Sequence, residues 1–85
     1  MNLRVLYFAR LREMVGTAQE DIVLPAEVNS IQALTTWLSA RGGVWQEAFS
    51  GGQRLRAAVN QELAADAAPI KDGDEVAFFP PVTGG

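Results

Sequence analysis

The stretch Asp72-Gly73-Asp74-Glu75-Val76-Ala77-Phe78-Phe79-Pro80-Pro81 decides the fold of this chain. Its first three residues are typical of a tight turn, and residues 75–79 predict a β-strand. Two prolines then end the strand, because proline has no N–H to donate to a neighbouring strand. The sequence therefore predicts a sheet strand that leads directly into the last residues, Val82-Thr83-Gly84-Gly85.

The first part of the chain predicts two more strands and a short helix. Residues 3–8 are apolar, with β-branched and aromatic members, and predict a strand. Residues 9–15 predict a short helix that ends at Gly16, and residues 20–24 predict a second strand. Because a short connection joins the two strands, we expect them to pair as antiparallel neighbours.

The main helix is expected to begin at Ser30, whose hydroxyl can accept a hydrogen bond from a free backbone N–H of the first turn. Apolar residues follow at helical spacing on one face, namely Ile31, Leu34 and Leu38. Gly42-Gly43 is typical of a left-handed helix end. Residues 45–49 are expected to pack back as a partly ordered turn.

Residues 55–60 predict another strand, and residues 62–63 add a few paired residues after a turn. One main helix covers one face of one sheet, so the order of elements predicts an α+β protein and not a doubly wound one. If the first and last strands are parallel neighbours in the centre, the fold is the ubiquitin-like β-grasp, a mixed sheet of about four to five strands with one main helix packed on one face. We expect residues 1–79 to form this domain and residues 80–85 a flexible C-terminal tail.

The composition narrows the possible functions. The 85 residues suffice for one domain and include no cysteine and no histidine, which excludes disulfides, thiolate metal sites and the commonest general base. The net charge of −3 argues against nucleic acid as a partner, because a nucleic-acid surface needs clustered Lys and Arg. No apolar stretch approaches the ~20 residues of a membrane helix, and no signal peptide is evident. We expect a cytoplasmic protein without a membrane partner.

The sequence indicates no catalytic site. Asp72-Gly73-Asp74-Glu75 lacks the further oxygen ligands of a calcium loop, so we interpret it as a turn and predict no metal site. No glycine-rich phosphate loop and no pairing of a nucleophile with a base are present. We therefore expect a protein that is not an enzyme on its own and that binds no cofactor.

Both faces of the two terminal strands carry apolar residues. One face is expected to hold Leu3, Val5, Tyr7, Val76 and Phe78, and the other Leu6, Phe8, Ala77 and Phe79. One helix cannot bury both faces. Either the second face is incidentally exposed, or Phe8 and Phe79 belong to a patch that docks a partner; we favour the partner interface. We interpret four arginines as solvated surface, with contacts at the rim of that interface as the alternative: Arg10, Arg12, Arg54 and Arg56.

The tail suits a segment that threads into a partner. From Pro80 to Gly85 it can reach roughly 20 Å. Pro80 and Pro81 reduce the entropy lost on ordering the segment, and Gly84 and Gly85 let a narrow channel close around their backbone. Conversion to an acyl-adenylate would make the terminal carboxylate reactive toward sulfide, a persulfide, a thiol or an amine. The ATP site for that step must lie on another protein.

Three stretches of the chain resemble the small subunit of molybdopterin synthase, the MoaD family. The stretches are Val5-Leu6-Tyr7-Phe8-Ala9-Arg10-Leu11-Arg12-Glu13 with Val15-Gly16-Thr17, Ala57-Ala58-Val59-Asn60-Gln61, and Asp72 to Gly85. The resemblance implies a β-grasp sulfur carrier of molybdenum cofactor biosynthesis. It implies that a ubiquitin-activating-like adenylyltransferase adenylates Gly85 with ATP, and that a sulfur donor protein then supplies the sulfur of a thiocarboxylate.

The resemblance also implies a heterotetramer with the large subunit of the synthase. The tail residues that would enter the large subunit are Pro80, Pro81, Val82, Thr83, Gly84 and Gly85. There the thiocarboxylate would donate its sulfur to cyclic pyranopterin monophosphate. Three alternatives stay open: a sulfur carrier for the thiamine or tungsten cofactor, a ubiquitin-like protein modifier, and a β-grasp interaction module with an inert tail.

Overall fold

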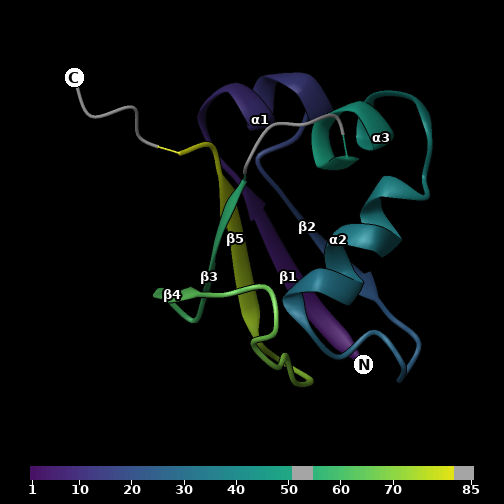
Figure 1. The fold of residues 1–85 in the computed structure, drawn as a ribbon, viewed down its shortest axis with the longest axis vertical. Coiled ribbons are helices and arrows are strands. Elements are labelled where there is room, and N and C mark those ends of the chain that lie inside the picture. The colour runs from purple at the N-terminus through teal and green to yellow at the C-terminus, as the bar shows by residue number, and fades with distance from the viewer. Residues whose placement is uncertain (51–54, 82–85) are drawn as a thin grey trace.

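The computed structural model describes residues 1–50 and 55–81, which form one sheet and three helices (Figure 1). The elements follow one another along the chain as β1 (Asn2–Tyr7), α1 (Ala9–Val15), β2 (Gln19–Val23), α2 (Ile31–Ser39), α3 (Gly43–Ser50), β3 (Arg56–Val59), β4 (Glu62–Ala64) and β5 (Glu75–Phe79).

The five strands lie in the order β2-β1-β5-β3-β4. The first and last strands, β1 and β5, are parallel neighbours at the centre, with Val5 opposite Val76 and Tyr7 opposite Phe78. All other neighbouring pairs are antiparallel. This arrangement confirms the expected β-grasp fold, and it places the C-terminal ends of β1 and β5 side by side.

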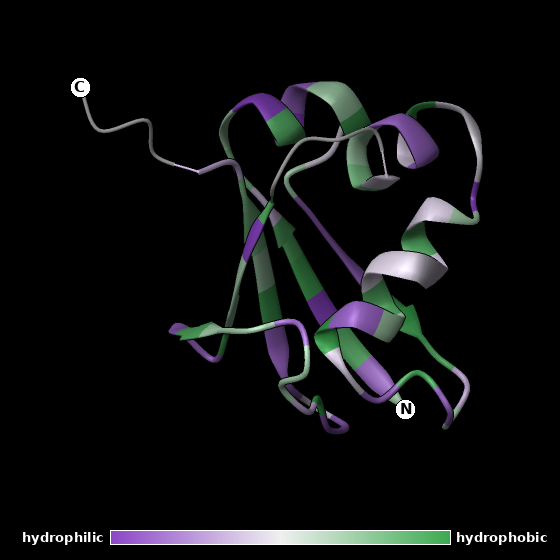
Figure 2. Cartoon of the chain, viewed as in Figure 1, coloured by the Kyte–Doolittle hydropathy of each residue, from purple (hydrophilic) through white to green (hydrophobic). Residues whose placement is uncertain are grey.

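The core lies between the helices and one face of the sheet. Along β1 the residues Leu3, Val5 and Tyr7 are buried and alternate with exposed or half-buried ones, and Val76 and Phe78 continue this face on β5. Helices α2 and α3 lie to one side of the sheet and α1 lies over the C-terminal ends of β1 and β5 (Figure 1). Hydrophobic residues run along the two central strands (Figure 2). The alternation predicted from the sequence is confirmed, and the face that bears Leu6 has no helix against it in the part of the chain that the structure describes.

The described residues contain one more helix than the sequence predicted, because α3 is present in addition to α1 and α2. Residues 45–49, expected to be a turn, belong to the helix α3, whose Ala48 and Phe49 are buried. The ring of Phe49 packs edge-on against Phe78, with centroids 5.2 Å apart. Gly42 has a φ of 78° and turns the chain between α2 and α3, so the glycine pair marks a corner between two helices.

The main helix α2 begins where the sequence predicts. The Ser30 hydroxyl accepts a hydrogen bond from the Ala33 backbone N–H at 3.1 Å, which satisfies one of the free donors of the first turn. The apolar stripe of the helix is buried, with Leu34 and Leu38 fully inaccessible. Because this helix and β1 share one core, the cap helps to hold the central strand in place.

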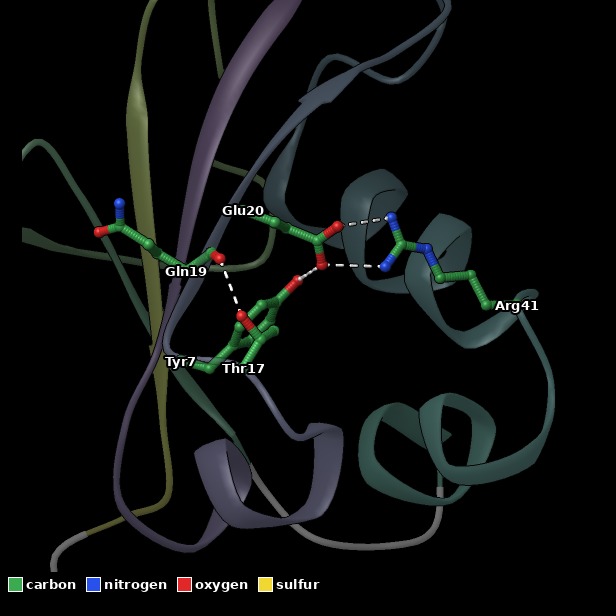
Figure 3. A network of polar contacts seen from close by, with 5 residues as sticks. All are labelled: Tyr7, Thr17, Gln19, Glu20 and Arg41. Atoms are coloured by element: carbon green, nitrogen blue, oxygen red, sulfur yellow. Dashed lines mark hydrogen bonds and ion pairs between the residues drawn. The ribbon is translucent and has the colours of Figure 1, made fainter.

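A polar network joins β1, β2 and the segment after α2 (Figure 3). The Tyr7 hydroxyl donates to Glu20 at 2.7 Å, and Arg41 donates two hydrogen bonds to the same carboxylate at 2.9 and 3.1 Å. The Arg41 guanidinium also lies 4.5 Å from the ring centre of Trp45 and 5.0 Å from that of Trp37, within the range of cation–π attraction. The network ties the helical layer to the sheet near the C-terminal end of β1.

The network shifts the pKa values of two of its members. Burial, reinforced by the hydrogen bond to Glu20, raises the pKa of the Tyr7 phenol far above its usual range, so the hydroxyl stays a donor. Burial alone would raise the pKa of Glu20, but the hydrogen bonds from Arg41 and Tyr7 and the charge of Arg41 outweigh it and hold that pKa below its usual value.

Candidate functional site

The candidate site is the open face of the sheet together with the point where the chain leaves it. Cross-strand pairs place Leu6 beside Ala77, Ala77 beside Ala58, and Ala58 beside Leu63. Phe8 follows Leu6 by two residues in extended backbone, and Phe79 follows Ala77 by two, so both lie on the same face. We call this surface the outer apolar patch: Leu6, Phe8, Ala58, Leu63, Ala77 and Phe79.

Two residues dominate the exposed area of this patch. Phe8 is 47% exposed and Leu63 is 69% exposed, whereas Phe79 is half-buried. Val23 is a further exposed apolar residue, but it pairs with Asn2 at the opposite end of β1. Phe8 lies at the end of the sheet where β5 finishes, whereas Leu63 lies level with Ala77 at the middle of β5. The patch therefore runs from the tail base across the open face, and such a contiguous apolar surface is typical of a site that docks another protein.

The backbone places Phe8 against the base of the tail. The N–H of Phe8 donates to the carbonyl of Phe78 at 3.1 Å, so the end of β1 and the last residues of β5 are held side by side. Pro80 is half-buried and Pro81 is exposed, and both continue directly from this pair. The two predicted interface residues, Phe8 and Phe79, are therefore brought together on neighbouring strand ends, and the tail begins directly after Phe79.

The other predicted tail residues, Val82, Thr83, Gly84 and Gly85, lie outside the described residues, as does Arg54. Their expected roles stay predictions. The structure fixes where this segment starts, because Phe79 pairs with Arg56 on β3. The last described residues therefore leave the sheet from between two strands, β1 and β3.

Leu63 was not predicted as a site residue, and its position depends on a tight hairpin. Asn60 and Gln61 have positive φ values of 50° and 71°, the conformation of the two central residues of a type I′ turn. The Asn60 side chain donates to Asp74 at 3.0 Å and accepts from the Glu75 N–H at 3.0 Å. These bonds anchor the β3–β4 hairpin to the start of β5 and hold Leu63 on the patch; the Asn-Gln pair between two apolar runs was the available signal.

Within residues 1–50 and 55–81, no group of three or more metal-ligating side chains is found. The same residues contain no helix that is long and apolar enough to span a membrane. The arrangement is that of an open apolar face from which the last described residues, Pro80 and Pro81, leave the sheet.

Comparison with known proteins gives consistent relatives. The chain is 46% identical to the molybdopterin synthase sulfur carrier subunit of Escherichia coli, over 98% of this chain and 99% of that protein. A molybdopterin converting factor subunit 1 from Pyrococcus furiosus has a similar structure, with a TM-score of 0.77 and 28% identity over 96% of this chain and 99% of that one.

A third relative was solved as a complex. A chain from the complex of subunits 1 and 2 of the molybdopterin-converting factor of Helicobacter pylori matches with a TM-score of 0.67 and 26% identity, over the full length of both chains. The family model described as the ThiS family matches residues 5–85, which include the second half of β1, the whole of β5, the outer apolar patch and the tail. The chain therefore belongs to the ThiS family.

Proposed function

We propose that this chain is the sulfur carrier subunit of a molybdopterin synthase. The observation that carries the proposal is the similarity to the Escherichia coli sulfur carrier subunit along almost the entire length of both chains. The Gly84-Gly85 end and the position of its base at the edge of an apolar docking patch support it. The role is a non-catalytic one within a sulfur-transferring complex.

The chemistry would proceed at the carboxylate of Gly85. A carboxylate oxygen attacks the α-phosphorus of ATP on an adenylyltransferase of the ubiquitin-activating type, and pyrophosphate leaves. A persulfide on the donor protein then attacks the acyl carbon, and AMP leaves with the bonding electron pair to give an acyl disulfide. A thiol of the donor system attacks the donor's sulfur in that acyl disulfide, which forms a new disulfide on the donor and releases the thiocarboxylate. The thiocarboxylate would give its sulfur to cyclic pyranopterin monophosphate in the large subunit.

The described residues would serve this chemistry by docking. In our proposal the outer apolar patch binds the large subunit, in a cytoplasmic heterotetramer of small and large subunits, and Pro80 and Pro81 direct the tail toward the partner's active site. The Helicobacter pylori relative was solved together with its subunit 2, which supports a large-subunit partner. Because Phe8 and Phe79 flank the tail base, docking and tail insertion would occur together.

The test is the intact mass of the chain after incubation with its adenylyltransferase, ATP and a sulfur donor. We expect a mass increase that matches the replacement of one oxygen by sulfur, and we expect it to be absent when Gly85 is deleted. A chain with one residue added after Gly85 is the matched control, since it keeps the docking face and should also stay unmodified.

The outcomes separate the alternatives. An unmodified mass with an enzyme set that thiocarboxylates another carrier would refute the proposal and favour an inert interaction module. Isopeptide adducts on target proteins would favour a modifier. If the thiocarboxylated chain forms no molybdopterin with the large subunit, a carrier for the thiamine or tungsten cofactor is favoured instead.

A further inference from the structure

Almost all basic residues of this chain are arginine. Of its seven basic residues, all but one are arginine, and Lys71 is the single lysine. Arginine and lysine carry the same charge, but they differ in chemistry beside an activated carboxyl group. The positions of these residues relative to the tail therefore bear on what can react with it.

Three arginines lie around the base of the tail. Arg56 is the cross-strand partner of Phe79, the residue before Pro80. Arg10 lies in the first turn of α1, and the N–H of Arg12 donates to the carbonyl of Phe8 at 3.3 Å. All three side chains are exposed. Since Phe8 is bonded to Phe78, these side chains lie well inside the roughly 20 Å that a six-residue tail can reach.

Lys71 lies at the opposite end of the sheet. It precedes the turn into β5, and the N–H of Gly73 in that turn donates to the carbonyl of Asn2 at 2.7 Å. Figure 1 shows this turn at one end of β5 and the start of the tail at the other. Five strand residues alone separate the turn from Pro80 by about 17 Å. A tail would have to run back along the sheet, nearly fully extended, to bring its end near this amine.

Arginine differs from lysine as a nucleophile. The lysine ε-amine has a pKa near 10.4, so a small neutral fraction exists at neutral pH and can attack an acyl-adenylate. The guanidinium of arginine stays protonated in proteins and offers no free lone pair. A lysine tethered beside the tail would act at an effective concentration on the order of millimolar, and it would compete with the sulfur donor.

We propose that arginine at positions 10, 12 and 56 keeps positive charge beside the tail without an amine that would capture the activated carboxyl group. Arg10, Arg12 and Arg56 are then specificity-determining residues, which leave the acyl group to sulfur. The inference rests on the proposed function. In the side reaction that they prevent, an amine attacks the acyl carbon, AMP leaves with the bonding electron pair, the amine loses a proton to solvent, and an isopeptide closes the chain on itself.

The experiment introduces amines by conservative substitution. Arg10→Lys and Arg56→Lys place a lysine within reach of the tail, and Arg56→Gln removes the charge without adding an amine. Val23→Lys is the matched control, because Val23 is 74% exposed and pairs with Asn2, at the far end of β1 from the tail. Each full-length chain, at a concentration of about ten micromolar, is incubated with the adenylyltransferase and ATP but without a sulfur donor. Its intact mass is followed over time.

We expect Arg10→Lys and Arg56→Lys to lose the mass of one water molecule as the isopeptide forms. The loss should be on the order of a hundredfold faster than in wild type or in Val23→Lys, as the ratio of millimolar to ten micromolar amine requires. Its rate should rise about tenfold per pH unit between pH 7 and 9, because the neutral amine is the reactant. Arg56→Gln should behave as wild type.

Two results would overturn the inference. One is equal behaviour of both lysine variants and wild type while ATP–pyrophosphate exchange shows that all are adenylated. The other is rapid isopeptide formation by wild type itself through Lys71, which Lys71→Arg would abolish. If wild type shows no exchange with an active adenylyltransferase, the proposed function fails, and this inference fails with it; the exchange assay thus separates the two cases.

Discussion

Leu63 provides the sharpest test of the outer apolar patch, because its side chain is 69% exposed. Full burial of a leucine is worth about 1.5–3 kcal/mol, and roughly two thirds of that, about 1–2 kcal/mol, remains for a partner to gain. Leu63→Ala should therefore weaken binding of the large subunit about 5- to 30-fold. The same change should cost folding less than about 1 kcal/mol, because only the smaller part of the side chain is buried.

The assay is calorimetric titration of the full-length chain into the large subunit, with thermal unfolding measured in parallel. Val23→Ala is the matched control, since Val23 is 74% exposed but lies at the far end of β1. Its dissociation constant should stay within about twofold of wild type. If Leu63→Ala binds as wild type does, or if Val23→Ala is weakened as much, then the docking surface is not the outer apolar patch.

Three further predictions concern the interface and the fold. Phe79→Asp should weaken binding of the large subunit by at least about tenfold, since a charge would replace apolar area beside the tail; full affinity with an intact fold would contradict this. The pKa of Glu20 is depressed in the folded chain. Ionised Glu20 therefore contributes to the free energy of unfolding above its unfolded pKa near 4.3, and this contribution is lost as the pH falls through the pKa of the folded chain. Urea unfolding should therefore show Glu20→Gln less stable than wild type at pH 7, with a gap that narrows toward pH 3; a constant gap would refute the assignment. Ser30→Ala should cost about 1 kcal/mol and lower the melting temperature by about 4–8 °C, and an unchanged melting temperature would mean that the cap does not stabilise α2.

The sequence was sufficient to predict the bounds of an element where neighbouring residues in the chain mark its limits. Strand β5 and the short helix α1 have the predicted bounds, because a turn, a run of β-formers or a glycine end marks each limit. Helix α3 was missed because Gly42-Gly43 indicates a break and the apolar spacing that follows is short. Its stability comes from contacts of Phe49 with Tyr7 and Phe78, which only the folded chain brings together.

The site shows the same division. Alternation along two strands was enough to predict that Phe8 and Phe79 share the open face. Leu63 could not be assigned, because β4 has only three residues and its face depends on the turn conformation of Asn60 and Gln61. The network of Glu20 with Arg41 joins residues 21 positions apart in the chain, and no sequence period indicates such a pair.

The parallel pairing of β1 with β5 has a mechanical consequence. A partner that draws the tail into a channel exerts a pull along β5, and β5 is bonded on one side to β1 and on the other to β3. Such a pull loads all the backbone hydrogen bonds of both ladders at once, in shear, whereas an edge strand would be peeled off one bond at a time. The chain can therefore transmit tension from its tail into the centre of the sheet, and the domain resists unfolding when a partner pulls on that tail.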